Sequence, residues 1–391
     1  MHDTIPSNRA SVILKNRSVR GAPAGMILLL FMAWPARAAL AQGKVDVRQI
    51  NSLFAGIASD RDPGVAVLVL RNGRTIFECG YGAADLATMR PIDARTNFRL
   101  ASLTKQFTAM AVMLLVRDGK LSYGTALTDI FPDFPEYGRG ITVRNLLQHT
   151  SGLLDYESLM PGYDPGAPHD DIPQIQDEEV LELLKRQTTT KFPPGTRWDY
   201  SNSGYVLLGL IIARVSARPF DEFLQERIFR PLGMEGSVAY RKRKNDVANR
   251  AFGHSMRQGA WRRTDQSPTS ATLGDGGVYS SLADLARWDQ ALREHALLGE
   301  EEMQAALTPV RVAEGSVVEP GGAHAEYGFG WFLNPYKGHP RMWHYGETIG
   351  FRTAIQRFTA DGLTVIVLCN RSDLDASALA LKAAELCLPG P

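Results

Sequence analysis

Cysteine is scarce in this chain, which holds only three among 391 residues. Cys79, Cys369 and Cys387 lack the paired spacing of a metal site, and an odd number does not form a disulfide framework. The sequence contains no His-Glu-x-x-His metal motif. It also contains no Gly-x-Ser-x-Gly, which argues against the nucleophile elbow of an α/β-hydrolase. We expect buried free thiols, with a single bridge as the alternative in an oxidising compartment.

Neither sign of charge is in excess, since 43 lysines and arginines stand against 42 acidic residues. Residues 1–41 carry a net charge of +4, which leaves the remainder at −3. The only basic run is Arg241–Lys244, which we interpret as a solvated loop. A nucleic-acid partner needs a concentrated basic face, so we expect none.

The N-terminal segment has the three parts of a secretory signal peptide. Basic residues between positions 15 and 20 precede an apolar core over 25–34, and Ala39-Leu40-Ala41 follows as a small-x-small cleavage pattern. The apolar core is short for a membrane span, which needs about 20 residues. We therefore expect a signal peptide at 1–41, a mature domain at 42–391, and a periplasmic or secreted protein without a membrane span. An uncleaved anchor is the alternative.

Strand-like patterns lie near both ends of the chain, and helical patterns lie between them. Asn72-Gly73 and Asp361-Gly362 are tight hairpin signals, each between two apolar runs. A helix is expected from Ser102 to about Asp118, where Gly119 stops it. The other expected strands are 65–70, 75–81, 327–333, 341–345, 351–358 and 363–369, and the other expected helices are 143–148, 178–186, 205–215, 220–229, 282–294 and 376–386.

This order predicts an α/β (α+β) fold with one antiparallel sheet built from both chain ends and flanked by helices. The α/β lobe would comprise about 45–105 and 276–391, and an inserted, mainly helical lobe would comprise about 106–275. A cleft between two lobes is a common place for a binding site.

A serine and a lysine stand three residues apart in Ser102-Leu103-Thr104-Lys105, at the predicted start of a helix. Residues i and i+3 lie on one face of a helix, so Lys105 can reach the hydroxyl of Ser102 and help to remove its proton. Partial burial would lower the pKa of Lys105 and make the neutral amine accessible. A plain N-cap serine is the alternative interpretation.

Tyr200-Ser201-Asn202 precedes an apolar helix and is the second candidate motif. The phenol of Tyr200 would ionise more easily near a lysine and could then act as a general base. Asn202 offers an amide that can both donate to and accept from Lys105 and a substrate.

His344-Tyr345-Gly346 lies on a predicted strand and is the third candidate motif. The imidazole of His344 could contribute positive charge or a hydrogen bond, and Gly346 would let a substrate approach the backbone. The N–H of Glu347 could join that of Ser102 as an oxyanion hole. His149 is the main rival histidine, and we interpret it as a structural turn residue.

In this order the three motifs resemble those of the class C β-lactamase and serine DD-peptidase family, the penicillin-recognising serine hydrolases that include family esterases. Leu146–Leu153 and Gly276–Ser281 also look like family segments. The resemblance spans about residues 50–385 and implies a β-lactamase/transpeptidase-like fold.

The resemblance also implies an exported serine hydrolase that cleaves an ester or amide through an acyl-Ser102 intermediate. Its catalytic residues would be Ser102, Lys105 and Tyr200, without a metal or an organic cofactor. The substrate-binding residues that it implies are Asn202, His344, Tyr345, Gly346 and Glu347.

One departure from the family pattern concerns the third motif, which is usually Lys-Thr-Gly in β-lactamases of this class. Tyr345 replaces the threonine that helps to hold a substrate carboxylate, and this favours an esterase or amidase with another acyl group. A β-lactam, a D-amino-acyl peptide and a carboxylic ester all remain open. We expect a monomer acting on a small-molecule or peptidoglycan-like substrate. The alternative is a non-catalytic binder or sensor of penicillin or a cell-wall ligand.

Overall fold

The computed structural model describes residues 46–163, 173–319 and 322–389. The chain divides into two units, Met1–Gln42 and Gly43–Pro391, and only the second contains described residues. The expected signal peptide at 1–41 lies outside them. Among the described residues, none of the helices combines the length and apolarity that a membrane span requires.

The second unit alternates short strands and helices. Its described helices are α1 (Val47–Phe54), η1 (Ala101–Leu103, 3-10), α2 (Thr104–Arg117), α3 (Leu127–Ile130), η2 (Glu136–Gly140, 3-10), α4 (Val143–Leu147), α5 (Tyr156–Leu159), α6 (Asp177–Lys185), α7 (Asn202–Ser216), α8 (Phe220–Leu224), η3 (Gln225–Phe229, π-helical), α9 (Leu282–Glu294), α10 (Glu300–Leu307) and α11 (Ala376–Glu385). Its described strands are β1 (Val65–Arg71), β2 (Arg74–Tyr81), β3 (Ala83–Asp85), β4 (Arg90–Pro91), β5 (Phe98–Arg99), β6 (Val238–Ala239), β7 (His254–Arg257), β8 (Ala260–Arg263), β9 (Val278–Ser280), β10 (Arg341–Thr348), β11 (Phe351–Phe358) and β12 (Leu363–Cys369).

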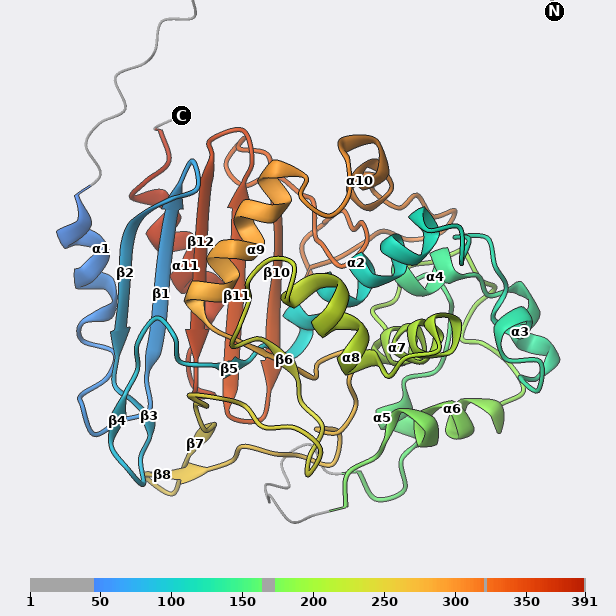
Figure 1. Cartoon of the computed structure of the whole chain (residues 1–391), viewed down its shortest axis with the longest axis horizontal. Coiled ribbons are helices and arrows are strands. Elements are labelled where there is room, and N and C mark those ends of the chain that lie inside the picture. The colour runs from blue at the N-terminus through green and yellow to red at the C-terminus, as the bar shows by residue number, and fades with distance from the viewer. Residues whose placement is uncertain (1–45, 164–172, 320–321, 390–391) are drawn as a thin grey trace, which may run out of the picture. The chain divides into compact units, whose positions relative to one another are not determined.

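A five-stranded antiparallel sheet joins the two ends of the chain, in the order β10-β11-β12-β1-β2 (Figure 1). β1 pairs with β12 in a register that places Val65 opposite Cys369. Asn72 and Gly73 connect β1 to β2, and both have positive φ, at 51° and 75°, as a type I′ hairpin turn requires. The prediction of one antiparallel sheet built from both chain ends is confirmed.

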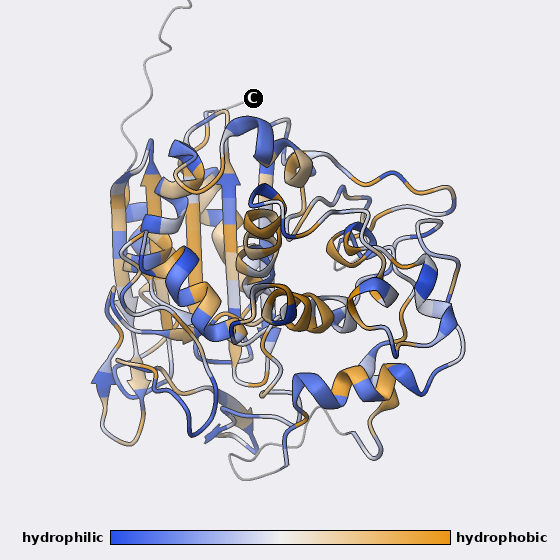
Figure 2. Cartoon of the chain, turned by 45° about the vertical axis from the view of Figure 1, so that its right-hand side comes forward, coloured by the Kyte–Doolittle hydropathy of each residue, from blue (hydrophilic) through white to orange (hydrophobic). Residues whose placement is uncertain are grey.

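The two faces of this sheet pack against different helices because alternate side chains of a strand point to opposite faces. Val65, Val67 and Val69 of β1 share a core with α1 and α11. Ala66 and Leu68 face the larger core, which includes α2, α7 and α9. With both faces covered, the central strands β1 and β12 are almost wholly apolar, and Figure 2 shows hydrophobic strands in this sheet.

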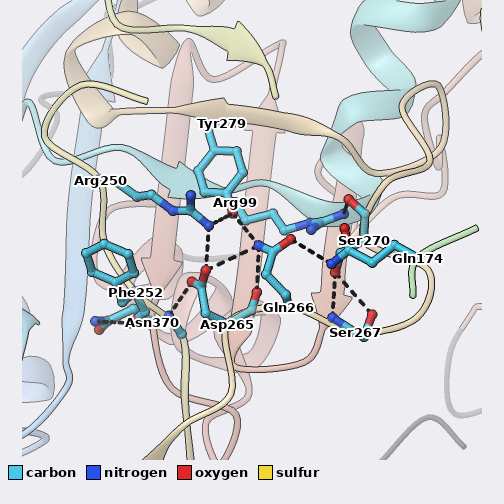
Figure 3. A network of polar contacts seen from close by, with 11 residues as sticks. Arg99, Gln174, Arg250, Phe252, Asp265, Gln266, Ser267, Ser270, Tyr279 and Asn370 are labelled. Carbon is cyan, nitrogen blue, oxygen red and sulfur yellow. Dashed lines mark hydrogen bonds and ion pairs between the residues drawn. The ribbon is translucent and has the colours of Figure 1, made fainter. Parts of the chain in front are cut away.

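A polar network fixes the segment of β7 and β8 beside the sheet (Figure 3). Arg250 forms an ion pair with Asp265 and donates a hydrogen bond to Tyr279 Oη on β9 at 3.0 Å. Asn370, directly after β12, donates to the carbonyl of Phe252 at 3.0 Å. Since β9 also pairs with β5, the network supports the strand that leads into η1.

Two local predictions were wrong. The stretch 327–333 forms isolated bridges instead of a strand, because Tyr327 and Trp343 both bridge to Phe332 across a turn at Gly330, where φ is +75°. The helix α6 spans Asp177–Lys185 with Gln176 at its N-cap position, so it begins and ends one residue before the expected 178–186.

The expectations for the cysteines and for the two lobes have different outcomes. The three cysteines are unpaired, with Cys369 and Cys387 buried and Cys79 half-buried. The division into two lobes stays a prediction.

A buried ion pair generates the first test. On α9, Asp289 accepts from Arg357 Nε at 2.6 Å and from Thr364 Oγ1 at 2.8 Å, and both charged side chains are buried. We expect Asp289→Ala to lower the free energy of unfolding by about 3–5 kcal/mol, because it leaves the Arg357 charge buried and unpaired.

Urea unfolding measures this loss. The matched control is the double variant Asp289→Leu/Arg357→Met, which removes both charges and should recover most of the stability. A single variant as stable as the unsubstituted protein would contradict the assignment.

Candidate active site

Ser102 lies in the short helix η1, between β5 and α2, and is half-exposed. The preceding Ala101 is buried and has φ of +49°, in the left-handed region that a residue with a Cβ rarely adopts. Such a conformation costs on the order of 1–3 kcal/mol and persists only where the surrounding fold enforces it. The packing of η1 against β10 and β11 supplies that enforcement.

Lys105 is fully buried one turn later, and its amine bonds to three oxygens from three parts of the chain. Nζ lies 2.9 Å from Ser102 Oγ, 2.9 Å from Asn202 Oδ1 at the start of α7, and 3.0 Å from the carbonyl oxygen of Asp275. The structure therefore brings the first motif and Asn202 of the second motif into direct contact.

The buried position changes the protonation of this amine. Burial lowers the pKa of Lys105 to about 8, and the negative charge of Asp275 opposes the shift. Part of the lysine population is then neutral near neutral pH and can accept a proton from the Ser102 hydroxyl.

Tyr200 lies next to this pair, with its ring centroid 4.9 Å from Lys105 Nζ. Its hydroxyl oxygen is buried and has no hydrogen-bond partner of good geometry among the described residues. Burial raises the pKa of the Tyr200 phenol, while the Ser102 hydroxyl acts in the opposite direction. The phenol is thus held neutral, contrary to the expectation that the lysine would ease its ionisation.

The third motif lies on β10, with His344 buried, Tyr345 half-buried and Glu347 exposed. Burial lowers the pKa of His344 to about 3, and the charge of Lys105 adds to this effect. His344 is therefore neutral, so the expectation that it could contribute positive charge is wrong. Its ring makes hydrogen-bond contacts instead, 2.6 Å from Nδ1 to the carbonyl of Tyr345 and 3.2 Å from Nε2 to Tyr327 Oη.

Gly346 has a structural use beyond the substrate access that we expected. A Cβ at this position would lie 2.2 Å from the carbonyl oxygen of Leu100, 2.4 Å from Thr353 Oγ1 and 3.1 Å from the backbone nitrogen of Ser102. Only a residue without a side chain lets β10 lie this close to η1. The third motif is thereby held against the backbone of Ser102.

Two residues that the sequence analysis did not assign to the site lie behind Tyr200. The imidazole of His149 stacks on the Tyr200 ring, with centroids 4.3 Å apart, and Tyr327 Oη lies 3.1 Å from His149 Nε2. His149 belongs to the family-like segment Leu146–Leu153, which was the available signal. No sequence signal indicated Tyr327, because residues 327–333 were expected to form a strand.

Three carboxylates influence Lys105, and two of them, Asp155 and Glu157, lie at the start of α5. Asp155 and Glu157 both act electrostatically on the lysine, as does Asp275. Burial, followed by the charges of Asp155 and Asp275, raises the pKa of Glu157 to about 7. One side-chain oxygen of Asp155 and one of Asp275 are buried without a hydrogen-bond partner in the described part of the chain. These carboxylates would gain from a cationic group placed beside them.

No group of three or more histidine, cysteine, aspartate or glutamate side chains within 46–163, 173–319 and 322–389 could hold a metal ion.

Comparison with known proteins finds a family model and several relatives that are similar to this chain in sequence. Residues 50–388 match the family model described as Beta-lactamase. Penicillin-binding protein 4* of Bacillus subtilis is 30% identical over 358 residues, which cover 88% of this chain and 76% of the relative. A D-aminopeptidase of Gluconobacter oxydans is 28% identical over 332 residues, and the match spans 84% of this chain but only 59% of that enzyme's length.

Solved structures agree in fold. An octameric penicillin-binding protein homologue from Pyrococcus abyssi superposes with a TM-score of 0.74 at 26% identity, covering 87% of this chain and 77% of that one. A D-amino acid amidase from Ochrobactrum anthropi SV3, complexed with L-phenylalanine amide, gives a TM-score of 0.73 at 25% identity, covering 87% and 99%.

The close approach at Gly346 gives a test of how tightly the nucleophile is positioned. Gly346→Ala should force β10 and η1 apart and slow the labelling of Ser102 by a fluorophosphonate probe by about 10²-fold, the order of loss that a 1 Å misplacement causes. The control is Gly56→Ala, because a Cβ there would have no neighbour within 4 Å. Equal labelling rates in the two variants would show that the packing at Gly346 does not position Ser102.

Proposed function

This chain belongs to the β-lactamase family of serine hydrolases, and we propose that it hydrolyses amides or esters through an acyl-Ser102 intermediate. The observation that carries the proposal is the 2.9 Å contact between Ser102 Oγ and the buried amine of Lys105. An alcohol is a weak nucleophile at its ordinary pKa and needs an adjacent base. Of the candidate bases, Lys105 is the one with a lowered pKa and a direct contact.

Acylation follows from this contact. The neutral amine of Lys105 takes the proton of the Ser102 hydroxyl while Oγ forms a bond to the substrate carbonyl carbon. The backbone N–H groups of Ser102 and Glu347 are the proposed donors to the developing oxyanion. The Lys105 ammonium then returns a proton to the leaving amine or alkoxide, through the Tyr200 phenol, as the carbonyl-to-leaving-group bond breaks.

Deacylation uses the same groups in reverse roles. Water attacks the acyl carbon, Lys105 accepts its proton, and Ser102 leaves with a proton returned from the ammonium. Asn202 Oδ1 and the carbonyl of Asp275 keep the amine directed at Oγ through both steps.

The substrate class follows from the charges around Ser102. A neutral His344 and the bulky Tyr345 replace the Lys-Thr pair that holds a carboxylate, whereas Asp155 and Glu157 act on Lys105 as negative charges. This distribution disfavours substrates with a carboxylate, such as β-lactams. It favours an amide or ester that carries a free amine. The similarity to a D-aminopeptidase and a D-amino acid amidase supports D-aminoacyl amides as that class.

The rival function is a non-catalytic binder or sensor of penicillin or a cell-wall ligand, in keeping with the penicillin-binding relatives. The complete set of Ser102, Lys105 and Tyr200 counts against it, because a binder needs no general base. Stoichiometric acylation without release would favour it. Export after cleavage of residues 1–41, a periplasmic or secreted location and a monomeric state belong to the same proposal.

The protonation of Lys105 sets the expected pH dependence. The amine must be neutral to accept the Ser102 proton, and its pKa is lowered to about 8. The kcat/KM value should therefore rise about tenfold per pH unit below the pKa of Lys105 and level off above it. Steady-state kinetics on a p-nitrophenyl ester from pH ~5.5 to ~9.5 measures this profile.

The control for this profile is Ser102→Ala, which should abolish both turnover and fluorophosphonate labelling. A flat profile over the same range would remove Lys105 as the base, and labelling that survives Ser102→Ala would reject the nucleophile.

A substrate panel tests the proposed class. D-Alanine p-nitroanilide should be cleaved at least about tenfold faster than its N-acetyl derivative, because a charged hydrogen bond contributes about 1.5–3 kcal/mol. Nitrocefin, which carries a carboxylate, should be a poor substrate.

Glu157→Gln is the matched variant, because it keeps the shape of the side chain and removes the negative charge that Glu157 carries above its pKa of about 7. It should reduce the preference for the free amine without changing the rate on the N-acetyl compound. Faster turnover of nitrocefin than of D-alanine p-nitroanilide would make the chain a β-lactamase instead.

A further inference from the structure

A continuous chain of buried side chains connects the second and third motifs behind Tyr200. His149, Tyr327 and His344 are each at most 1% exposed. Tyr327 Oη lies 3.1 Å from His149 Nε2 and 3.2 Å from His344 Nε2. At the outer ends, His149 Nδ1 is 3.0 Å from the backbone nitrogen of Ser201, and His344 Nδ1 is 2.6 Å from the carbonyl oxygen of Tyr345.

The two backbone groups at the ends fix every hydrogen in this chain. The Ser201 N–H can only donate, so His149 Nδ1 is an acceptor and the single hydrogen of a neutral imidazole lies on Nε2. The Tyr345 carbonyl can only accept, so His344 carries its hydrogen on Nδ1 and Nε2 is bare. Tyr327 Oη must then accept from His149 and donate to His344. The opposite tautomer of either imidazole would bring two hydrogens, or two lone pairs, into contact with each other.

Both imidazoles are neutral, as this assignment requires. Burial lowers the pKa of His149 well below its ordinary value, and the charge of Lys105 acts in the same direction. The same two causes lower the pKa of His344 to about 3.

The chain touches the site at both ends. His149 stacks on the ring of Tyr200, at an interplanar angle of 30°, and its Nδ1 holds the backbone of Ser201 between Tyr200 and Asn202. His344 holds β10 two residues before Gly346, which packs against the backbone of Ser102.

We propose that Tyr327 is a positioning residue, whose hydroxyl joins His149 and His344, each held in its tautomer by a backbone group, and so holds Tyr200 and β10 in place around Ser102. The assignment of tautomers stands on the hydrogen bonds alone. Its kinetic consequence rests on the proposed function.

The direct test is the tautomer of each histidine, read from long-range 1H–15N correlations of protein labelled with 15N-histidine. At neutral pH we expect one buried histidine protonated on Nε2 and another protonated on Nδ1, assigned to His149 and His344 by the loss of each signal in His149→Asn and His344→Asn. Finding both rings in the same tautomer, or either one charged, would overturn the proposal. This measurement needs no activity, so it is separate from a failure of the proposed function.

The kinetic test is Tyr327→Phe, which removes the hydroxyl and keeps the ring. We expect kcat on D-alanine p-nitroanilide to fall about 10- to 100-fold, with KM changed less than about threefold, because the reacting groups are misplaced while the substrate pocket is kept. The Nε2 signals of both histidines should shift because they lose the Tyr327 hydroxyl, while both tautomers persist through the backbone groups of Ser201 and Tyr345. Fluorophosphonate labelling should still occur at Ser102.

The control is Tyr137→Phe, which removes a tyrosine hydroxyl that donates to the carbonyl of Leu184 at 2.7 Å. It should leave kcat and the Nε2 signals of both histidines unchanged. An unchanged kcat and unchanged Nε2 signals in Tyr327→Phe would contradict the positioning role. If that variant does not fold, the tautomers of the unsubstituted protein alone decide the question. Absence of any labelling of Ser102 in the unsubstituted protein would instead reject the proposed function.

Discussion

The buried amine of Lys105 is the group on which the arrangement of this site depends. Its three oxygen partners come from η1, from the start of α7 and from the segment before β9, which are distant in sequence. A lysine removed from water is destabilising unless its hydrogens are satisfied, so the fold must bring these segments together. The same burial lowers the pKa of the amine and makes it useful as a base. The burial of Lys105 therefore both requires its three hydrogen bonds and lowers the pKa that lets the amine accept a proton.

The surroundings of this amine are otherwise uncharged or acidic. His149 and His344 are neutral because they are buried and because the lysine charge disfavours a second cation nearby. Tyr200 is held as a phenol by the same exclusion of water. Hydrogen bonds in such a site are fixed in direction by their neighbours, and this permits tautomers to be assigned from the positions of backbone donors and acceptors.

The sequence predicts those parts that depend on local pattern. The i, i+3 spacing of Ser102 and Lys105 predicts a contact that the structure contains, and the turn signal Asn72-Gly73 predicts the hairpin of β1 and β2. It does not predict protonation, because the pKa of His344 depends on burial by elements from the whole chain. It also misplaces Tyr327, since an apolar stretch with two glycines has the composition of a strand but the backbone of a turn.

The pairing of β1 with β12 has a consequence for the biosynthesis of the molecule. A ribosome makes β1 long before β12, so the nascent chain carries an apolar strand whose second edge stays unpaired until β12 has been synthesised. Such an edge is prone to aggregate, and a chaperone would have to shield it during that interval. Because β10 is also made long after η1, the nascent chain has Ser102 before it has the strand that lies against it. This centre can assemble only after β10 has been synthesised.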